Sequence, residues 1–246
     1  MRRALLLLVL TLPLHAMAAG TRQAESTDNL LALSWQPTFC ETKPETRECR
    51  GLNRGGHPEA SQRLSLHGLW PQPRDRVYCG VSAKDIKRDK AGDWKHLPVP
   101  PLSTETQARL DAAMPGVASQ LDRHEWIKHG TCYNAKGGAE EYIQDALALT
   151  DAVNGSLVGT FLSESLGRSV STDAIRKRFD QAFGPDTGAR VQVTCLRDGD
   201  RTLIREIKLS LRGLITPGAD LGDLLRSARP QKSTCKAGIL DPTGLQ

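Results

Sequence analysis

The sequence predicts an α+β fold, with a central antiparallel sheet packed with helices in a disulfide-stapled single domain. The middle of the chain carries helical patterns, whereas two segments near its end alternate apolar with polar residues, as strands do. Six cysteines supply the staples, because an even number of cysteines in an exported protein indicates disulfides.

Residues 1–18 have the pattern of a signal peptide. Two arginines precede a mostly apolar run of eleven residues over 4–14, and an Ala-x-Ala cleavage pattern ends at Ala18. Eleven residues are too few to cross a bilayer as a helix, and no later segment is apolar enough to do so. We therefore predict a periplasmic or secreted protein in which residues 19–246 form one domain. The alternative is an uncleaved N-terminal anchor.

Two strands and a long loop are predicted for the first part of the mature chain. Residues 29–35 form a short apolar run of strand length, and residues 65–70 have the pattern of a buried strand that ends before prolines. Residues 80–104 carry five basic residues and then three prolines, so we predict a long loop there.

Helical patterns fill the middle of the chain. We expect Ser103 or Thr104 to cap the first helix, Thr172 to cap the last, and a glycine at position 130 to end the second. The predicted helices cover residues 104–114, 119–130, 138–153, 159–166 and 172–183.

The final third of the chain predicts a β-hairpin. Residues 189–196 and 202–211 both alternate apolar with polar side chains, which is typical of strands with one buried face. Between them, Arg197-Asp198-Gly199-Asp200 is a turn sequence. The two strands therefore form an antiparallel pair in the predicted sheet.

The cysteines all lie beyond the signal peptide, and we predict that they form three disulfides. Six cysteines allow 15 pairings, and their spacing does not choose among them. A metal cluster is the alternative, but the chain has no C-x-x-C spacing to support one. The cysteines are Cys40, Cys49, Cys79, Cys132, Cys195 and Cys235.

Charge does not identify the function. Two of the 33 basic residues lie in the leader, so the mature chain carries a formal net charge of +3 rather than +5 against 28 acidic residues. This excess permits an anionic substrate but is too small to indicate nucleic-acid binding by itself.

Two short segments hold the residues suited to acid–base chemistry. Residues 64–71 (LSLHGLWP) carry His67 beside Trp70, and residues 121–132 (LDRHEWIKHGTC) carry two more histidines. Histidine suits proton transfer because its ordinary pKa of about 6.5 makes both protonation states accessible. We expect the two remaining mature histidines, His57 and His96, to be surface residues.

The second segment places its functional groups by helix geometry. Residues four apart on a helix lie about 40° from each other and residues five apart about 140°. Glu125 should therefore lie beside His129 and orient its ring, while Lys128 should lie beside His124. The H-E-x-x-x-H spacing differs from the H-E-x-x-H of zinc proteases, so a zinc site, the competing interpretation, is disfavoured.

Both segments resemble the two active-site segments of the T2 family of secreted ribonucleases. The resemblance implies disulfides Cys79–Cys132 and Cys195–Cys235, which leave Cys40–Cys49 as a local loop. It also implies an α+β fold, in agreement with the pattern of elements. The small number of cysteines is more similar to bacterial than to plant or fungal members of the family.

The resemblance also implies catalytic roles for the segment residues. His129 would be the general base that takes the ribose 2′-hydroxyl proton, and His67 the general acid that protonates the departing 5′-oxygen. Lys128 and Glu125 would stabilise the pentacoordinate phosphorus, and His124 would hold the phosphate.

Substrate contacts are less well defined by the resemblance. Trp70 is similar to the base-stacking residue of the family, with a core tryptophan as the alternative, whereas we expect Trp126 and Trp35 to pack inward. The residues after the first segment depart from the eukaryotic pattern, so we expect little base preference. The basic residues between 84 and 95 either contact the RNA backbone or form a solvated face.

The function implied is a metal-independent endoribonuclease that cleaves single-stranded RNA through a 2′,3′-cyclic phosphate to 3′-phosphate ends. We expect no cofactor, no bound metal and no membrane contact after signal cleavage, and a monomer, because nothing in the sequence suggests an obligate partner. The rivals are a catalytically silent RNA-binding or signalling protein with this fold and a zinc hydrolase.

Overall fold

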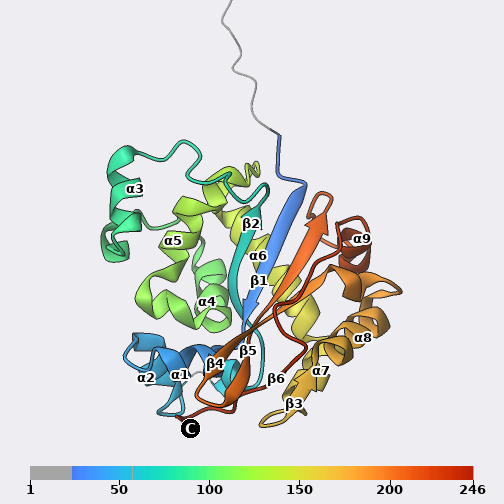
Figure 1. Ribbon diagram of the computed structural model, residues 1–246. Helices are drawn as coiled ribbons and strands as arrows, with labels where there is room; N and C mark the ends of the chain where they lie inside the picture. Colours follow the sequence, from blue (N-terminus) through green and yellow to red (C-terminus); the bar gives the residue numbers. More distant parts are fainter. Residues whose placement is uncertain (1–23, 57, 246) are drawn as a thin grey trace, which may run out of the picture.

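The computed structural model describes residues 24–56 and 58–245, so the predicted signal peptide and His57 lie outside the described residues. A six-stranded sheet forms the centre of the molecule, in the order β2-β1-β5-β6-β3, with β4 paired to β5 (Figure 1). The strands are β1 (Asp28–Ser34), β2 (Ser65–Pro71), β3 (Ser169–Ser171), β4 (Val191–Asp198), β5 (Arg201–Arg212) and β6 (Ala237–Ile239).

The sheet is antiparallel except at one place. β1 pairs antiparallel with β2 and β5, and β4 pairs antiparallel with β5 through the predicted turn. β6 adds a parallel contact to β5, where Leu203 pairs with Ile239. The predicted fold class and all four predicted strands are confirmed, whereas the short strands β3 and β6 were missed.

Helices flank the sheet on two sides. In Figure 1, α3, α4 and α5 lie on the β2 side of the sheet, with α3 outermost, and α7 to α9 lie on the opposite side. α6 crosses β1 and β2 and contacts both strands. The helices are α1 (Gln36–Thr42), α2 (Arg47–Leu52), α3 (Ala83–Lys90), α4 (Thr104–Ala113), α5 (Leu121–Lys128), α6 (Gly138–Asn154), α7 (Leu157–Ser163), α8 (Thr172–Phe183) and α9 (Leu221–Arg226).

The prediction of a continuous loop over residues 80–104 was wrong. α3 forms there because the Ser82 side chain accepts a hydrogen bond from the backbone N–H of Asp85 at 3.1 Å, which caps the helix. Basic residues in the last turn stabilise the helix through their interaction with its dipole. Gly92 follows with a positive φ of 73°, which glycine adopts without strain. The same cap chemistry places Ser171, rather than the predicted Thr172, at the start of α8.

The second predicted helix is shorter than expected. α5 begins after Gln120, which has a left-handed φ of 63°, and ends at Lys128 rather than at Gly130. His129 is the residue that caps its C-terminus, with φ −115° and ψ −49°. The predicted site residues of the second segment therefore lie on one short helix and at its end, which changes where the His129 side chain points.

One buried cluster holds the sheet against the helices. On β5, Ile207, Leu209 and Leu211 are fully buried and belong to the same cluster as Ile143 and Leu147 of α6. Burying each such side chain contributes about 1.5–3 kcal/mol. Because side chains alternate along a strand, the residues between them face the other side of the sheet, where the site is built.

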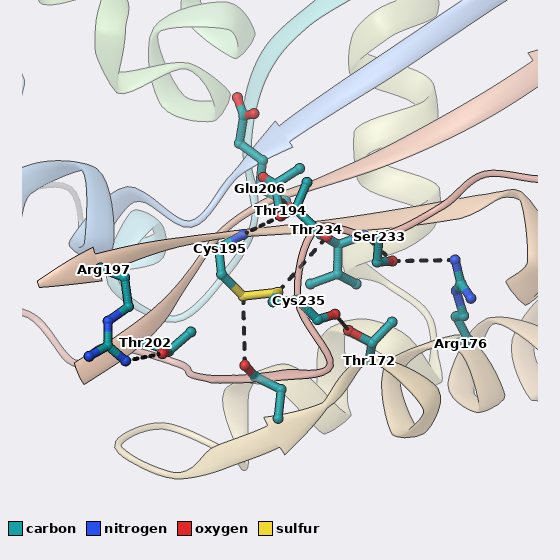
Figure 2. The surroundings of a disulfide bond; sticks show 12 residues. Thr172, Arg176, Thr194, Cys195, Arg197, Thr202, Glu206, Ser233, Thr234 and Cys235 are labelled. Carbon is teal, nitrogen blue, oxygen red and sulfur yellow. Dashed lines mark hydrogen bonds between the residues drawn. A yellow bond between two sulfur atoms is a disulfide. The ribbon is translucent and has the colours of Figure 1, made fainter. Parts of the chain in front are cut away.

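All three predicted disulfides are present: Cys40–Cys49, Cys79–Cys132 and Cys195–Cys235. Figure 2 shows Cys195 of β4 joined to Cys235, beside the hydrogen bond that Thr172 donates to the Cys235 carbonyl at 2.7 Å. This arrangement ties the C-terminal segment to β4 and α8. β4 in turn pairs with β5, which contributes Glu206 to the site.

Among the described residues, no helix has the length and apolar character needed to span a bilayer.

Candidate active site

The structure brings the predicted site residues to one cavity of about 340 Å³. β2 contributes His67 and Trp70, whereas α5 and its C-terminal cap contribute the remaining predicted residues. The cavity is lined by Leu30, His67, Trp70, Pro71, Gln72, Arg74, His124, Glu125, Lys128, His129, Gln192 and Lys208.

His67 is held between two carboxylates. Its Nδ1 lies 2.6 Å from Oε1 of Glu206, and its Nε2 lies 3.5 Å from Oε1 of Glu125. Burial lowers the pKa of His67, but the hydrogen bond that His67 donates to Glu206 and the charges of both carboxylates together outweigh burial, so the pKa is raised. Nδ1 therefore donates to Glu206, and Nε2 is directed toward Glu125 and the cavity.

Glu206 contacts the candidate site, and the sequence analysis missed it. Its second oxygen lies 3.0 Å from Nζ of Lys208, which also lies 5.0 Å from the centre of the Trp70 ring. Burial raises the pKa of Glu206, but His67 and Lys208 outweigh burial and bring it to about 2. Glu206 stays ionised, so it orients His67 without taking its proton.

Glu125 is a buried carboxylate at the centre of the site, with 1% of its surface exposed. Trp70 Nε1 donates a hydrogen bond to its Oε2 at 2.6 Å, and His124 Nε2 lies 3.8 Å from its Oε1. Burial raises the pKa of Glu125 despite the opposing charges of His67 and His124. A side chain on Gly68 would place a Cβ 2.0 Å from this carboxylate, which explains the glycine after His67.

His129 has the opposite environment to His67. Only 8% of it is exposed, and its buried Nδ1 has no hydrogen-bond partner among the described residues. Burial, together with the charges of Lys128, His124 and His67, lowers its pKa to about 3. His129 is therefore neutral, with its ring 5.4 Å from that of Trp70.

The expectation that Glu125 orients the His129 ring was wrong. The helix argument assumed that regular geometry continues to residue 129, but α5 ends one residue earlier. Only the backbone joins the two residues, through a hydrogen bond from the His129 N–H to the Glu125 carbonyl at 2.9 Å. The carboxylate instead contacts Trp70 and His67.

His124 is supported by the segment that was expected to be a loop. Its Nδ1 lies 2.7 Å from Oδ1 of Asp89 on α3, and its ring stacks on Trp94 at 4.5 Å. Tyr78 donates to the other Asp89 oxygen at 2.7 Å. The Nε2 of His124 is thereby directed toward Glu125 and the cavity, which is lined by Lys128 as well.

Two tryptophans pack inward, and a third lies in the site. Trp35 is fully buried in the core, and Trp126 packs against Tyr142 at 5.9 Å, as expected for both. Trp70 contacts the edge of His67 at 5.2 Å as well as His129 and Lys208, so its ring stands between the two histidines. His96 is exposed and pairs with Asp93.

One group of carboxylates among the described residues has the spacing of a metal site, and it lies outside the cavity. Glu25, Glu141 and Asp145 have oxygens within 4.8 Å of one another. Asp145 is the most buried of them and accepts a hydrogen bond from Tyr133 at 2.7 Å.

Comparison with known proteins places this cavity in a family. The family model of the Ribonuclease T2 family matches residues 28–220, which include every cavity residue named above. Ribonuclease I of Escherichia coli (strain K12) is 29% identical over 236 residues, which cover 86% of each chain. Ribonuclease 1 of Arabidopsis thaliana is 29% identical over 178 residues, 67% of this chain and 66% of its own.

The fold is also found in solved structures. Ribonuclease MC1 from the seeds of bitter gourd matches 86% of this chain and 98% of its own with a TM-score of 0.54 and 20% identity. The SF11-RNase of Nicotiana alata matches 89% and 99% with a TM-score of 0.55 and 16% identity. The chain belongs to the Ribonuclease T2 family and is an endoribonuclease that acts on RNA.

Proposed function

We propose that the cavity cleaves single-stranded RNA by transphosphorylation between two histidines. The observation that carries this proposal is that His67 and His129 line one cavity and both contact Trp70, in surroundings that shift their pKa values in opposite directions. Catalysis of this reaction needs one group that accepts a proton and one that donates a proton at the same time. Trp70, which contacts both rings, holds the two groups in one geometry.

The reaction begins with neutral His129 as the base. His129 takes the proton of the ribose 2′-hydroxyl, the 2′-oxygen bonds to phosphorus, and the bond from phosphorus to the 5′-oxygen breaks. Protonated His67 delivers its Nε2 proton to that oxygen. The bound phosphodiester adds a negative charge that raises the pKa of His129, so the base strengthens when substrate is present.

The products are a 2′,3′-cyclic phosphate and a 5′-hydroxyl end. Hydrolysis of the cyclic ester reverses the two roles: His67 takes a proton from water, and His129 returns one to the 2′-oxygen, which leaves a 3′-phosphate. DNA lacks the 2′-hydroxyl and does not react this way.

The remaining side chains stabilise charge on phosphorus. Lys128 and His124 face the non-bridging oxygens as cation and hydrogen-bond donor, and Asp89 fixes which nitrogen of His124 points inward. Glu125 is placed to bind a proton of the pentacoordinate state, because burial raises its pKa. We therefore propose a reaction that needs no metal and no cofactor.

The proposed substrate is single-stranded RNA with little base selection. Related enzymes have been solved with mononucleotides, such as a Ribonuclease MC1 variant with 5′-UMP and RNase NT with 5′-AMP. Trp70 retains base stacking as a proposed second role beside holding Glu125.

We further propose that residues 19–246 form the exported catalytic domain, which acts as a monomer in the periplasm or outside the cell. The apolar run and cleavage pattern of residues 1–18 support export.

The test is cleavage of a defined single-stranded RNA in excess EDTA, with the new ends identified by mass spectrometry. We expect cyclic-phosphate and 5′-hydroxyl ends. Loss of cleavage in EDTA would favour a metal-dependent hydrolase, and binding without cleavage would favour the silent RNA-binding rival.

A further inference from the structure

We propose that the RNA chain on the 5′ side of the cleaved bond binds in a second hollow beside the catalytic cavity. This hollow has a volume of about 430 Å³, and we name it the upstream groove. The inference rests on the proposed function, because it continues the same RNA strand. The residues of the groove used below are Asp28, Leu30, Gln72, Ser210, Arg212 and Arg229.

The groove is continuous with the catalytic cavity. Leu30 and Gln72 line both hollows. Leu30 pairs with Trp70 on β2 and with Ser210 on β5, so one row across the sheet runs from the site into the groove. Partly buried Leu30 forms an apolar floor between them, on which a base or ribose can pack.

β5 carries basic residues both in the catalytic cavity and in the upstream groove. Lys208, Ser210 and Arg212 alternate on β5 with the buried residues Leu209 and Leu211 and therefore share the face of the sheet that borders the two hollows. The backbone rises about 3.3 Å per residue, which sets Arg212 about 13 Å from Lys208. A cation thus stands at each end of the path.

The cations at the far end are available to bind phosphate. Arg212 and Arg229 are exposed, and neither forms an ion pair with a described residue, whereas Lys208 is held by Glu206. The single acidic residue in the groove lining is Asp28, opposite Arg212 in the strand register. The groove is net positive, and a free guanidinium binds a phosphate through two hydrogen bonds.

The position of the general acid sets the direction of the strand. Gln72 directly follows β2, five residues beyond His67, which is about 16 Å at the rise of a strand, so the general acid lies away from the junction with the upstream groove. The Nε2 of His67 protonates the 5′-oxygen of the leaving nucleoside, so that nucleoside lies beside His67. The upstream groove joins the catalytic cavity at Leu30 and Gln72 instead, and it receives the chain that precedes the cut.

The experiment uses oligonucleotides with one cleavable ribonucleotide in a 2′-O-methyl background, extended by four nucleotides on either its 5′ or its 3′ side. The comparison is the ratio of kcat/KM for the two extensions, in wild type and in the double variant Arg212→Gln/Arg229→Gln. We expect kcat/KM of wild type to be higher on the 5′-extended substrate than on the 3′-extended one. In the double variant, this ratio should fall about tenfold. The slope of log KM against log salt concentration should also decrease by roughly 1.4 in the double variant, since two phosphate contacts are removed.

A matched control carries the same loss of charge elsewhere. Arg47 and Arg54 are exposed at α2, outside the groove, and Arg47→Gln/Arg54→Gln should keep the wild-type ratio. Asp28→Asn should strengthen the preference for the 5′ extension. An unchanged ratio in the groove variant, or equal losses with both extensions, would overturn the groove while leaving the cyclic-phosphate chemistry intact. Absence of cyclic-phosphate ends in wild type would instead contradict the proposed function.

Discussion

His67 and His129 line the same cavity and contact the same tryptophan, yet their surroundings shift their pKa values in opposite directions. His67 stands on a strand between Glu206 and Glu125, which raises its pKa. His129 caps a short helix, its Nδ1 has no hydrogen-bond partner in the described part of the chain, and burial beside the cation of Lys128 lowers its pKa to about 3. The positions of buried carboxylates, rather than the histidines themselves, decide which ring is acid and which is base.

The largest expected effect separates the two roles chemically. His67→Ala and His129→Ala should each lower kcat by roughly 10²–10⁴-fold on RNA, because each removes one proton transfer. A ribonucleoside 3′-phosphate ester with a nitrophenyl leaving group needs no protonation to depart. It should restore turnover by His67→Ala but not by His129→Ala.

Steady-state kinetics on both substrates, with thermal unfolding to establish that each variant folds, measure this difference. Rescue of both variants, or of His129→Ala alone, would contradict the assignment of acid and base. Undiminished RNA cleavage by either variant would contradict the site itself.

The next largest effect concerns the residue that stands between the histidines. Trp70→Phe keeps a ring but removes the hydrogen bond to buried Glu125, and such bonds to charged groups contribute about 1.5–3 kcal/mol. We expect kcat on RNA to fall roughly ten- to a hundredfold with a smaller change in KM. Trp126→Phe, which alters a tryptophan packed on Tyr142, is the control. A loss confined to KM would assign Trp70 to base stacking alone.

A smaller effect tests whether Glu206 sets the protonation of His67. The pH profile of kcat/KM should be bell-shaped, with an acidic limb from His129 and a basic limb from His67 above its ordinary 6.5. Glu206→Gln keeps the side-chain shape without the charge. This substitution should lower the apparent pKa of the basic limb by roughly one unit and leave that of the acidic limb unchanged.

Asp145→Asn is the matched control, because it neutralises a buried carboxylate bonded to Tyr133 outside the cavity. It should move neither limb. A Glu206→Gln profile that falls uniformly at every pH would mean that Glu206 supports the fold without acting on His67.

The sequence predicted the parts of this site that follow from local order, and it missed those that depend on packing. His67, Trp70 and the α5 residues were found because their segments are distinctive in themselves. Glu206 and Lys208 were not, because they occupy the polar positions of an alternating strand, where a residue that enters a site looks like one that faces solvent.

The same limit explains the other errors. Asp89 and Trp94 lie in a segment whose basic residues and prolines indicated a loop, although Ser82 followed by Asp85 was a helix-start signal. The predicted pairing of Glu125 with His129 failed because the end of α5 depends on the turn that leads to Cys132, which helix periodicity does not encode.

The smallest effect is on stability, where the two histidines should act in opposite directions with pH. The folded state holds the pKa of His129 below its unfolded value, so the unfolded chain binds more protons and stability falls as pH decreases below 6.5 toward 3. The raised pKa of His67 has the opposite effect: its stabilisation is present below pH 6.5 and is lost as pH rises through the folded pKa.

Relative to wild type, His129→Gln should therefore gain about 1 kcal/mol in free energy of unfolding between pH 6.5 and 5.5, because one pKa unit corresponds to 1.36 kcal/mol. His67→Gln should show no such gain over the same interval. Urea unfolding of the three proteins at both pH values measures the difference, and parallel behaviour of the two variants would mean that the contrast between the histidines exists only when substrate is bound.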